Sequence, residues 1–296
     1  MFLPSFRLAL VACALLFSMV ACKKEKQEPT PVAEPMLVFR FKFDSTQQRL
    51  NNIGQPSTIP SGRAAQSPTF NQMSAHYVEL APTAFTALGA GEVLYKAPET
   101  NAGGATAIDF NQSVRAGHNE TFLKIPIKDV AAGNYSWLRV SLAYQNYDIR
   151  YKSSLLSGNQ MGTGTVASFI GFNTFIADYV INQESVAVNA NKPQGYWGFE
   201  TMGFTTTGQA PAGATTVPNP ISSTSPIPAG SCVVTGAFDQ PLVITGNETK
   251  DIEITVSLST NNSFEWTDDG DGLFQPEVGD AVVDMGIRGM IPFVQY

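Results

Sequence analysis

The chain has 296 residues, of which 18 are basic and 25 acidic, giving a formal net charge of −7. A protein of this charge does not attract the phosphate backbone of nucleic acids, so we expect no nucleic-acid partner. Charged residues make up only 15% of the chain. Thr, Ser, Asn, Gly and Phe are frequent instead, and this balance favours strands and turns over helices.

The N-terminus has the pattern of an export signal. An apolar run from Leu8 to Ala21 follows a single basic residue, Arg7, and closes with Met19-Val20-Ala21-Cys22. The run is too short for a membrane-spanning helix, so we predict a signal peptide over residues 1–21. The last four residues resemble the lipobox of bacterial lipoproteins, which implies cleavage before Cys22 and a lipid on its thiol. The resemblance implies an outer-membrane lipoprotein of the bacterial cell envelope and leaves open which face of the membrane it occupies.

Residues 22–35 read as a tether between this lipid and the folded protein. The segment from Lys23 to Glu28 is charged or polar, and three prolines follow it. Such a segment has little to bury, and its extended reach is roughly 40 Å at about 3.3 Å per residue.

Cysteine usage leaves one thiol in the folded part. Cys13 falls in the signal peptide and Cys22 in the lipobox, so only Cys232 remains and we expect no intrachain disulfide. Cys232 leads into two valines, and we interpret it as a small buried apolar residue, with a reactive thiol as the alternative.

From residue 36 onward the sequence carries the pattern of strands. The segment Leu37–Asp44 alternates apolar and charged residues, which predicts a strand with one wet face. After an irregular excursion over 45–72, further short apolar runs are separated by Gly or Pro. These predicted strands are Ser74–Leu80, Glu92–Tyr95, Ala105–Phe110, Phe122–Ile127, Gly195–Glu200 and Ile252–Leu258, with additional runs at Cys232–Val234, Leu242–Ile244 and Ala281–Phe293.

The longest pattern, from Tyr135 to Tyr151, changes phase within the strand. Apolar residues fall on even positions up to Tyr144 and on odd positions from Tyr147. One extra residue shifts the phase in this way, so we predict a β-bulge at Gln145-Asn146, with a sheet corner as the plainer alternative to a binding site.

Two later segments leave alternatives open. An amphipathic helix over Asn173–Ile181 competes with two short strands between Thr165 and Asn182, and the β-branched and aromatic residues favour the strands. Residues 205–231 are mostly Thr, Ser, Pro, Gly and Ala, which indicates a flexible insertion, a domain boundary being the alternative. We therefore predict an all-β fold, a mostly antiparallel β-sandwich with long irregular loops, in one domain over residues 36–296.

An acidic run after Trp266 has spacing that suits a metal. Laid on the twelve-residue calcium loop from Thr267, its third, fifth and sixth positions are Asp269, Asp271 and Gly272. The first position is Thr, and Glu277 comes one residue early. The sequence predicts one calcium ion, and a plain Asp-Gly hairpin turn is the alternative. The predicted ligands are Asp268, Asp269, Asp271, Glu277 and Asp280.

Copper is the weaker metal prediction, because the two histidines, His76 and His118, are far apart in sequence. The alternating strand at the start and Gly133-Asn134-Tyr135-Ser136-Trp137-Leu138-Arg139 resemble the lipid-anchored β-domains of MbnP-like, methanobactin-associated copper proteins. The resemblance implies a copper-binding partner protein and transfers no metal ligand.

No sequence motif of a catalytic site is present, neither Gly-x-Ser-x-Gly nor His-Glu-x-x-His nor a phosphate-binding glycine loop. We therefore expect a non-enzymatic binding or structural module with no catalytic residue to name, anchored to the membrane through its lipid. A carbohydrate-active enzyme or glycan-binding protein is the alternative, and a protein ligand stays open. Aromatic residues that would stack on a ligand if exposed are Tyr144, Tyr147, Tyr196 and Trp197.

Overall fold

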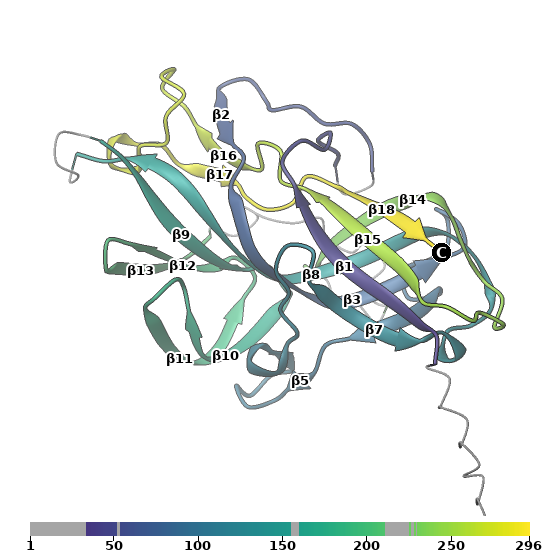
Figure 1. Ribbon diagram of the computed structural model, residues 1–296. Coiled ribbons are helices and arrows are strands. Elements are labelled where there is room, and N and C mark those ends of the chain that lie inside the picture. Colours follow the sequence, from purple (N-terminus) through teal and green to yellow (C-terminus); the bar gives the residue numbers. More distant parts are fainter. Residues whose placement is uncertain (1–33, 52–53, 155–159, 211–224, 226–227, 229) are drawn as a thin grey trace, which may run out of the picture. The chain divides into compact units, whose positions relative to one another are not determined.

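The computed structural model describes residues 34–51, 54–154, 160–210, 225, 228 and 230–296 (Figure 1). Strands dominate these residues, which confirms the all-β prediction. The helical elements are three short 3-10 turns, Phe110–Gln112 (η1), Ile127–Asp129 (η2) and Pro276–Val278 (η3). Within the described ranges no helix is long and apolar enough to cross a membrane. The predicted signal peptide, Cys22 and nearly all of the tether lie outside the described residues.

The largest sheet has seven strands in the order β13-β12-β9-β8-β3-β4, with β14 paired to β8. All its pairings are antiparallel. Its strands are β3 (Thr69–Ala81), β4 (Glu92–Lys96), β8 (Gly133–Lys152), β9 (Met161–Phe169), β12 (Tyr196–Thr201), β13 (Phe204–Gln209) and β14 (Cys232–Ile244).

A second sheet covers part of the first. It has the order β18-β15-β1-β7 and consists of β1 (Met36–Asp44), β7 (Thr121–Pro126), β15 (Ile252–Ser259) and β18 (Met290–Gln295). In Figure 1 β1 and β15 cross in front of β3 and β8. Strands β1 and β15 run parallel, with Leu37 opposite Ile252, whereas the other pairs are antiparallel.

The main core lies between these two sheets, because both present apolar residues at every second position. In β1 the buried side chains are Leu37, Phe39 and Phe41, and in β15 they are every second residue from Ile252 to Leu258. The predicted alternation of these two strands is therefore confirmed, and so is the sandwich of mostly antiparallel strands.

Two smaller sheets complete the fold. One has the order β11-β10-β6-β5 and contains β5 (Glu99–Thr100), β6 (Ala107–Asp109), β10 (Asn173–Val180) and β11 (Ser185–Pro193). It encloses a second apolar cluster against the other face of β8, β9 and β12. The other is the three-stranded sheet β17-β16-β2, made of β2 (Arg63–Gln66), β16 (Phe264–Thr267) and β17 (Val282–Asp284).

The phase change in β8 occurs at Ala143, two residues before the predicted bulge at Gln145-Asn146. Ala143 has no partner in β3, because Leu142 pairs with Ala75 and Tyr144 with Ser74. Strand β8 also changes its other neighbour at this point, from β14, which pairs up to Leu142, to β9, which begins at Tyr144. The bulge therefore marks an exchange of strand partners.

Strand predictions in the second half of the chain met mixed outcomes. The segment Asn173–Val180 is strand β10, so the prediction of strands over a helix is confirmed. The runs predicted separately at Cys232–Val234 and Leu242–Ile244 belong to one strand, β14, with a register shift between Ala237 and Leu242. The segment predicted as a flexible insertion begins inside strand β13. Its first residues, Thr205 to Thr207, pair with β12. Residues 211–224 of that segment lie outside the described residues.

Candidate functional site

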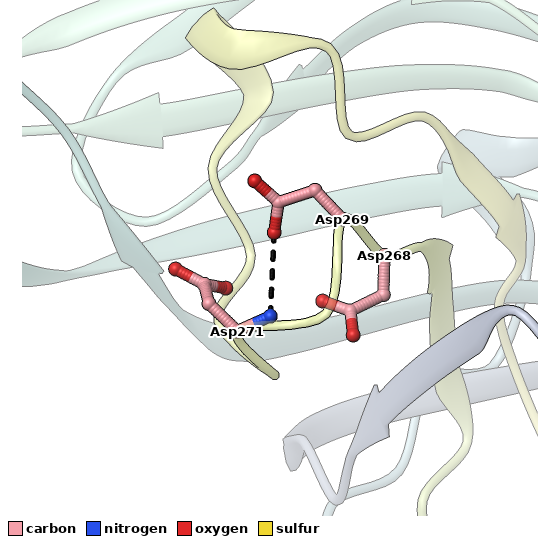
Figure 2. A group of neighbouring side chains, drawn as sticks. All are labelled: Asp268, Asp269 and Asp271. Atoms are coloured by element: carbon pink, nitrogen blue, oxygen red, sulfur yellow. Dashed lines mark hydrogen bonds between the residues drawn. The ribbon is translucent and has the colours of Figure 1, made fainter.

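The predicted calcium loop follows β16 as a tight turn. One carboxylate oxygen from each of Asp268, Asp269 and Asp271 lies within 4.8 Å of the others, and Figure 2 shows the three side chains around the turn. The carboxylates also hold the backbone, since Asp268 accepts a hydrogen bond from the Gly272 amide at 3.0 Å. Gly270 and Gly272 have φ values of +108° and +72°, which residues with a Cβ rarely adopt.

The other two predicted ligands are placed differently. Glu277 accepts hydrogen bonds from the Ser153 hydroxyl and from the Ser154 amide, the latter at 3.0 Å, and so ties η3 to the end of β8. Asp280 accepts a hydrogen bond from the Gln275 amide at 2.7 Å. Burial raises the pKa of Asp280, and the negative charges of the three clustered aspartates raise it further. The fold thus gathers three of the five predicted ligands, places Asp280 within their electrostatic field and uses Glu277 elsewhere.

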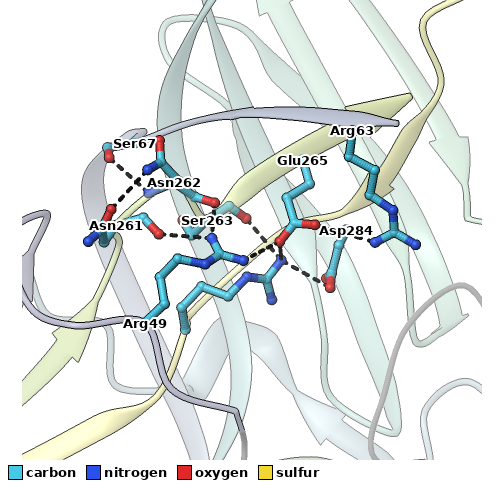
Figure 3. A network of polar contacts seen from close by, with 9 residues as sticks. Arg49, Arg63, Ser67, Asn261, Asn262, Ser263, Glu265 and Asp284 are labelled. Atoms are coloured by element: carbon cyan, nitrogen blue, oxygen red, sulfur yellow. Dashed lines mark hydrogen bonds and ion pairs between the residues drawn. The ribbon is translucent and has the colours of Figure 1, made fainter. Parts of the chain in front are cut away.

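A second charged group, which the sequence did not indicate, surrounds Glu265 on β16 (Figure 3). We call it the arginine cluster, and it consists of Arg49, Arg63, Glu265, Asp284 and Arg288. The Glu265 carboxylate accepts from Arg49 Nη2 at 2.5 Å and contacts Arg288 Nη2 at 3.1 Å and Arg63 Nη1 at 3.3 Å. Arg288 also reaches Asp284 Oδ2 at 3.0 Å.

The arginine cluster is largely removed from water. The Glu265 side chain is 3% exposed, and those of Arg49 and Arg288 are 10% and 13% exposed. Burial alone would raise the pKa of Glu265, but the hydrogen bond from Arg49 and the charges of Arg288 and Arg49 lower it overall. Glu265 is therefore ionised at neutral pH. A cavity of about 310 Å³, the arginine pocket, is lined by all five members of the cluster together with the Cys232–Val234 and Met285–Gly289 segments.

An apolar groove of about 420 Å³ lies between the large sheet and the three-stranded sheet. Its lining is almost wholly hydrocarbon, and Asp284 and Met285 line the arginine pocket as well, so the two cavities adjoin. The apolar side chains that line the groove include Tyr151, Trp197, Phe199, Phe264, Phe274 and Val282.

Local sequence explains why β12 contributes two rings to this groove. Side chains alternate across a strand, so Tyr196 points into the second apolar cluster while Trp197 and Phe199 point the other way. A Cβ at Gly208 would lie 2.4 Å from the Trp197 ring, and one at Gly164 would lie 2.3 Å from the Phe199 ring. Each ring therefore lies over a glycine, and both residues remain partly exposed.

The aromatic residues that we predicted as ligand contacts divide accordingly. Tyr144, Tyr147 and Tyr196 are at most 7% exposed and belong to the apolar clusters, so they do not meet the condition of exposure on which stacking against a ligand depended. Tyr147 belongs to the main core, whereas Tyr144 and Tyr196 belong to the second apolar cluster. Of the four residues, Trp197 lines the apolar groove.

The two histidines have separate partners. His76 is buried, and its Nε2 lies 2.9 Å from Glu99 Oε1. His118 accepts a hydrogen bond through Nδ1 from the Phe43 amide at 3.1 Å. Among the described residues the three clustered aspartates are the only group of three or more His, Cys, Asp or Glu side chains close enough for one metal ion.

Comparison with known proteins gives no relative: no family model, no curated protein and no solved structure matches this chain.

Proposed function

We propose that this chain is a binding protein of the bacterial cell envelope, anchored through a lipid on Cys22, that holds a small apolar molecule in the apolar groove. The observation that carries the proposal is the groove itself. Its volume of about 420 Å³ falls within the range of about 300–1,000 Å³ of small-molecule sites, which are concave and mostly apolar. Open apolar surface of this kind costs free energy in water, so a protein keeps it where it binds something.

The composition of the groove favours a hydrocarbon ligand over a sugar. Among its lining side chains only Tyr151, Trp197, Gln209 and Asp284 carry hydrogen-bonding groups, and the Tyr151 hydroxyl is already 2.8 Å from the Thr201 hydroxyl. A glycan needs many hydrogen-bond partners because its hydroxyls lose water on binding. The paired His76 and Glu99 likewise give no support to the copper alternative.

The test is binding of the uncharged fluorescent probe Nile red to the purified protein. Val282 lines the groove and is 37% exposed, so Val282→Glu should place a charge beside the ligand without unfolding the chain. Val93→Glu, on the edge strand β4 at 43% exposure, is the matched control. We expect the wild type and the control to bind the probe and Val282→Glu to lose it. Equal fluorescence from all three proteins would refute a ligand site in the groove.

The proposal includes one structural calcium ion at Asp268, Asp269 and Asp271. Three carboxylates within 4.8 Å repel one another, and a divalent cation relieves that repulsion while water and backbone oxygens complete the coordination. The chain from Phe274 to Met285 directly follows this turn and supplies one wall of the groove. Calcium would therefore order the groove as well as the loop.

Thermal unfolding with and without calcium tests this part. An ion that binds only the folded state stabilises it by roughly 2.7 kcal/mol when free calcium is a hundredfold above Kd. The Tm should rise with calcium and fall with a chelator, and Asp271→Asn should remove the difference. Asp178→Asn, exposed on β10, is the control that should keep it. A wild-type Tm that ignores millimolar calcium would leave the plain hairpin turn.

A further inference from the structure

The arginine pocket carries one positive charge in excess in a protein that is otherwise acidic. Three arginines line it against two carboxylates, Glu265 and Asp284, while the whole chain has a formal net charge of −7. Because Asp284 and Met285 line both cavities, this positive site adjoins the end of the apolar groove. An adjoining apolar and cationic surface is complementary to an amphipathic anion.

Donors at this site remain available. Within the described part of the chain, the Arg63 guanidinium contacts Glu265 through one atom, Nη1. The Arg63 side chain is 35% exposed. A guanidinium has five N–H donors in a planar fork that matches a carboxylate. Arg49 and Arg288 contact the same carboxylate at 10% and 13% exposure, so Arg63 is the most exposed of the three arginines.

Unsatisfied polar groups underlie the same pocket. Within the described part of the chain the buried Nε atoms of Arg49 and Arg288 have no hydrogen-bond partner, and neither does either amide atom of the fully buried Gln145. Gln145 lies beneath Gly286, a lining residue whose added Cβ would be 3.1 Å from Gln145 Oε1. Buried polar groups are nearly always satisfied, so these atoms supply hydrogen-bonding capacity beside the pocket that bound water or a ligand head group would use.

We propose that the ligand is an aliphatic carboxylate, whose carboxylate binds Arg63 in the arginine pocket and whose hydrocarbon chain lies along Trp197 and Phe199 in the apolar groove. The inference rests on the proposed function of the groove and names its ligand class. A monoanion matches the single excess charge of the pocket, and a planar carboxylate matches the guanidinium fork. A cationic head group would meet three arginines, and an uncharged one would accept hydrogen bonds from Arg63 without offsetting the excess positive charge.

The test compares three amphiphiles with the same twelve-carbon chain, each displacing Nile red below its micelle concentration. These are dodecanoate, dodecanol and dodecyltrimethylammonium. We expect dodecanoate to bind the wild type about tenfold more tightly than dodecanol, as a charge-assisted hydrogen bond requires. Arg63→Gln should remove that preference while keeping dodecanol affinity. The matched control is Arg150→Gln, an exposed arginine of β8 that lines neither cavity, and it should keep the preference.

The outcomes separate this inference from the proposed function. Equal affinities of dodecanoate and dodecanol, or tighter binding of the cation, would overturn the carboxylate assignment while leaving an apolar ligand site. Failure of all three amphiphiles to displace the probe, or failure of the probe to bind, would overturn the groove as a ligand site. Circular dichroism of Arg63→Gln shows whether a lost preference comes from the head-group site or from unfolding.

Discussion

Replacing Glu265 by glutamine should destabilise the fold by about 3–5 kcal/mol, the usual cost of breaking a buried ion pair from one side. Glutamine has nearly the same volume, so no cavity forms. The glutamine keeps one acceptor oxygen, but its NH2 group must face at least one of the three guanidinium groups. In the wild type these groups contact the Glu265 carboxylate at 2.5–3.3 Å. For a domain of this size the loss corresponds to a drop in Tm of about 6–20 °C. Thermal unfolding followed by circular dichroism measures it.

The pH dependence of this loss gives a stricter check. The pKa of Glu265 lies below its ordinary value of 4.5, because the arginines outweigh the effect of burial. A carboxyl group with a depressed pKa stabilises the fold fully above the unfolded pKa and loses that contribution as pH falls through the folded pKa. The difference in stability between wild type and Glu265→Gln should therefore be constant near neutrality and shrink in acid.

A matched control separates this buried network from a surface ion pair. Glu253 lies 3.5 Å from Arg40, and its side chain is 46% exposed. Glu253→Gln should change the free energy of unfolding by less than about 0.5 kcal/mol. Similar Tm values for the two variants, or a Glu265→Gln deficit that persists in strong acid, would refute the role assigned to the arginine cluster.

Three further predictions concern His76, Cys232 and Gly236. Burial lowers the pKa of His76, against the opposing effect of Glu99. Below about pH 6.5 the unfolded chain therefore binds a proton that the folded chain does not, and the free energy of unfolding should decrease as the pH falls. His76→Gln should remove this pH dependence in denaturant titrations at a series of pH values. Desolvation and the charge of Asp284 raise the pKa of the Cys232 thiol to about 12. Because the thiolate is the reactive form, iodoacetamide should label Cys232 far more slowly at pH 8 in the native protein than in the urea-unfolded protein. Mass spectrometry of the Cys232 peptide measures the two labelling rates. A Cβ at Gly236 would lie 2.4 Å from the Met290 carbonyl oxygen, and Gly236→Ala should lower the free energy of unfolding by about 1–3 kcal/mol in urea titration.

The strands of the main core were predictable because their signal is local. Alternation in β1 and β15 tells which residues are buried without any knowledge of the partner, and the structure confirms both. Their parallel pairing is not contained in either segment, since 215 residues separate Leu37 from Ile252 in sequence. Nothing in an alternating strand specifies the direction of its neighbour.

The displaced bulge shows that alternation no longer predicts which face a residue occupies where both faces of a strand are covered by apolar residues. Tyr144 continues the even-numbered series Leu138, Val140 and Leu142, so the sequence places it with them. In the structure β8 is covered on both sides at this point, and Tyr144 belongs to the second apolar cluster while Leu142 belongs to the main one. An aromatic residue fits either side, so only the partner strands reveal the shift.

The acidic loop and the arginine cluster also differ in whether the sequence could predict them. The acidic loop was predictable because its three clustered aspartates lie within four residues of one another. The arginine cluster was not, because the contact between Arg49 and Glu265 spans 216 residues. Strands β8, β9, β12 and β17 contribute residues to the groove. Its aromatic residues follow the alternating pattern of core residues, and the sequence does not show that this face of the sheet is incompletely covered.

Strand length explains why that face stays open. Strand β8 has 20 residues, whereas β2, β16 and β17 have only four, four and three. At about 3.3 Å per residue each strand of the three-stranded sheet is at most roughly 13 Å long, whereas β8 is about 66 Å long. The rings of Trp197 and Phe199 would be buried against a longer β17, and a core so closed would have no groove. The chain after β16 instead turns through the acidic loop, which ends in the segment that forms the outer wall. A calcium ion in that loop would stabilise a wall that sheet pairing leaves short, so the proposed metal site and the proposed ligand site predict linked behaviour: removing calcium should weaken binding in the groove.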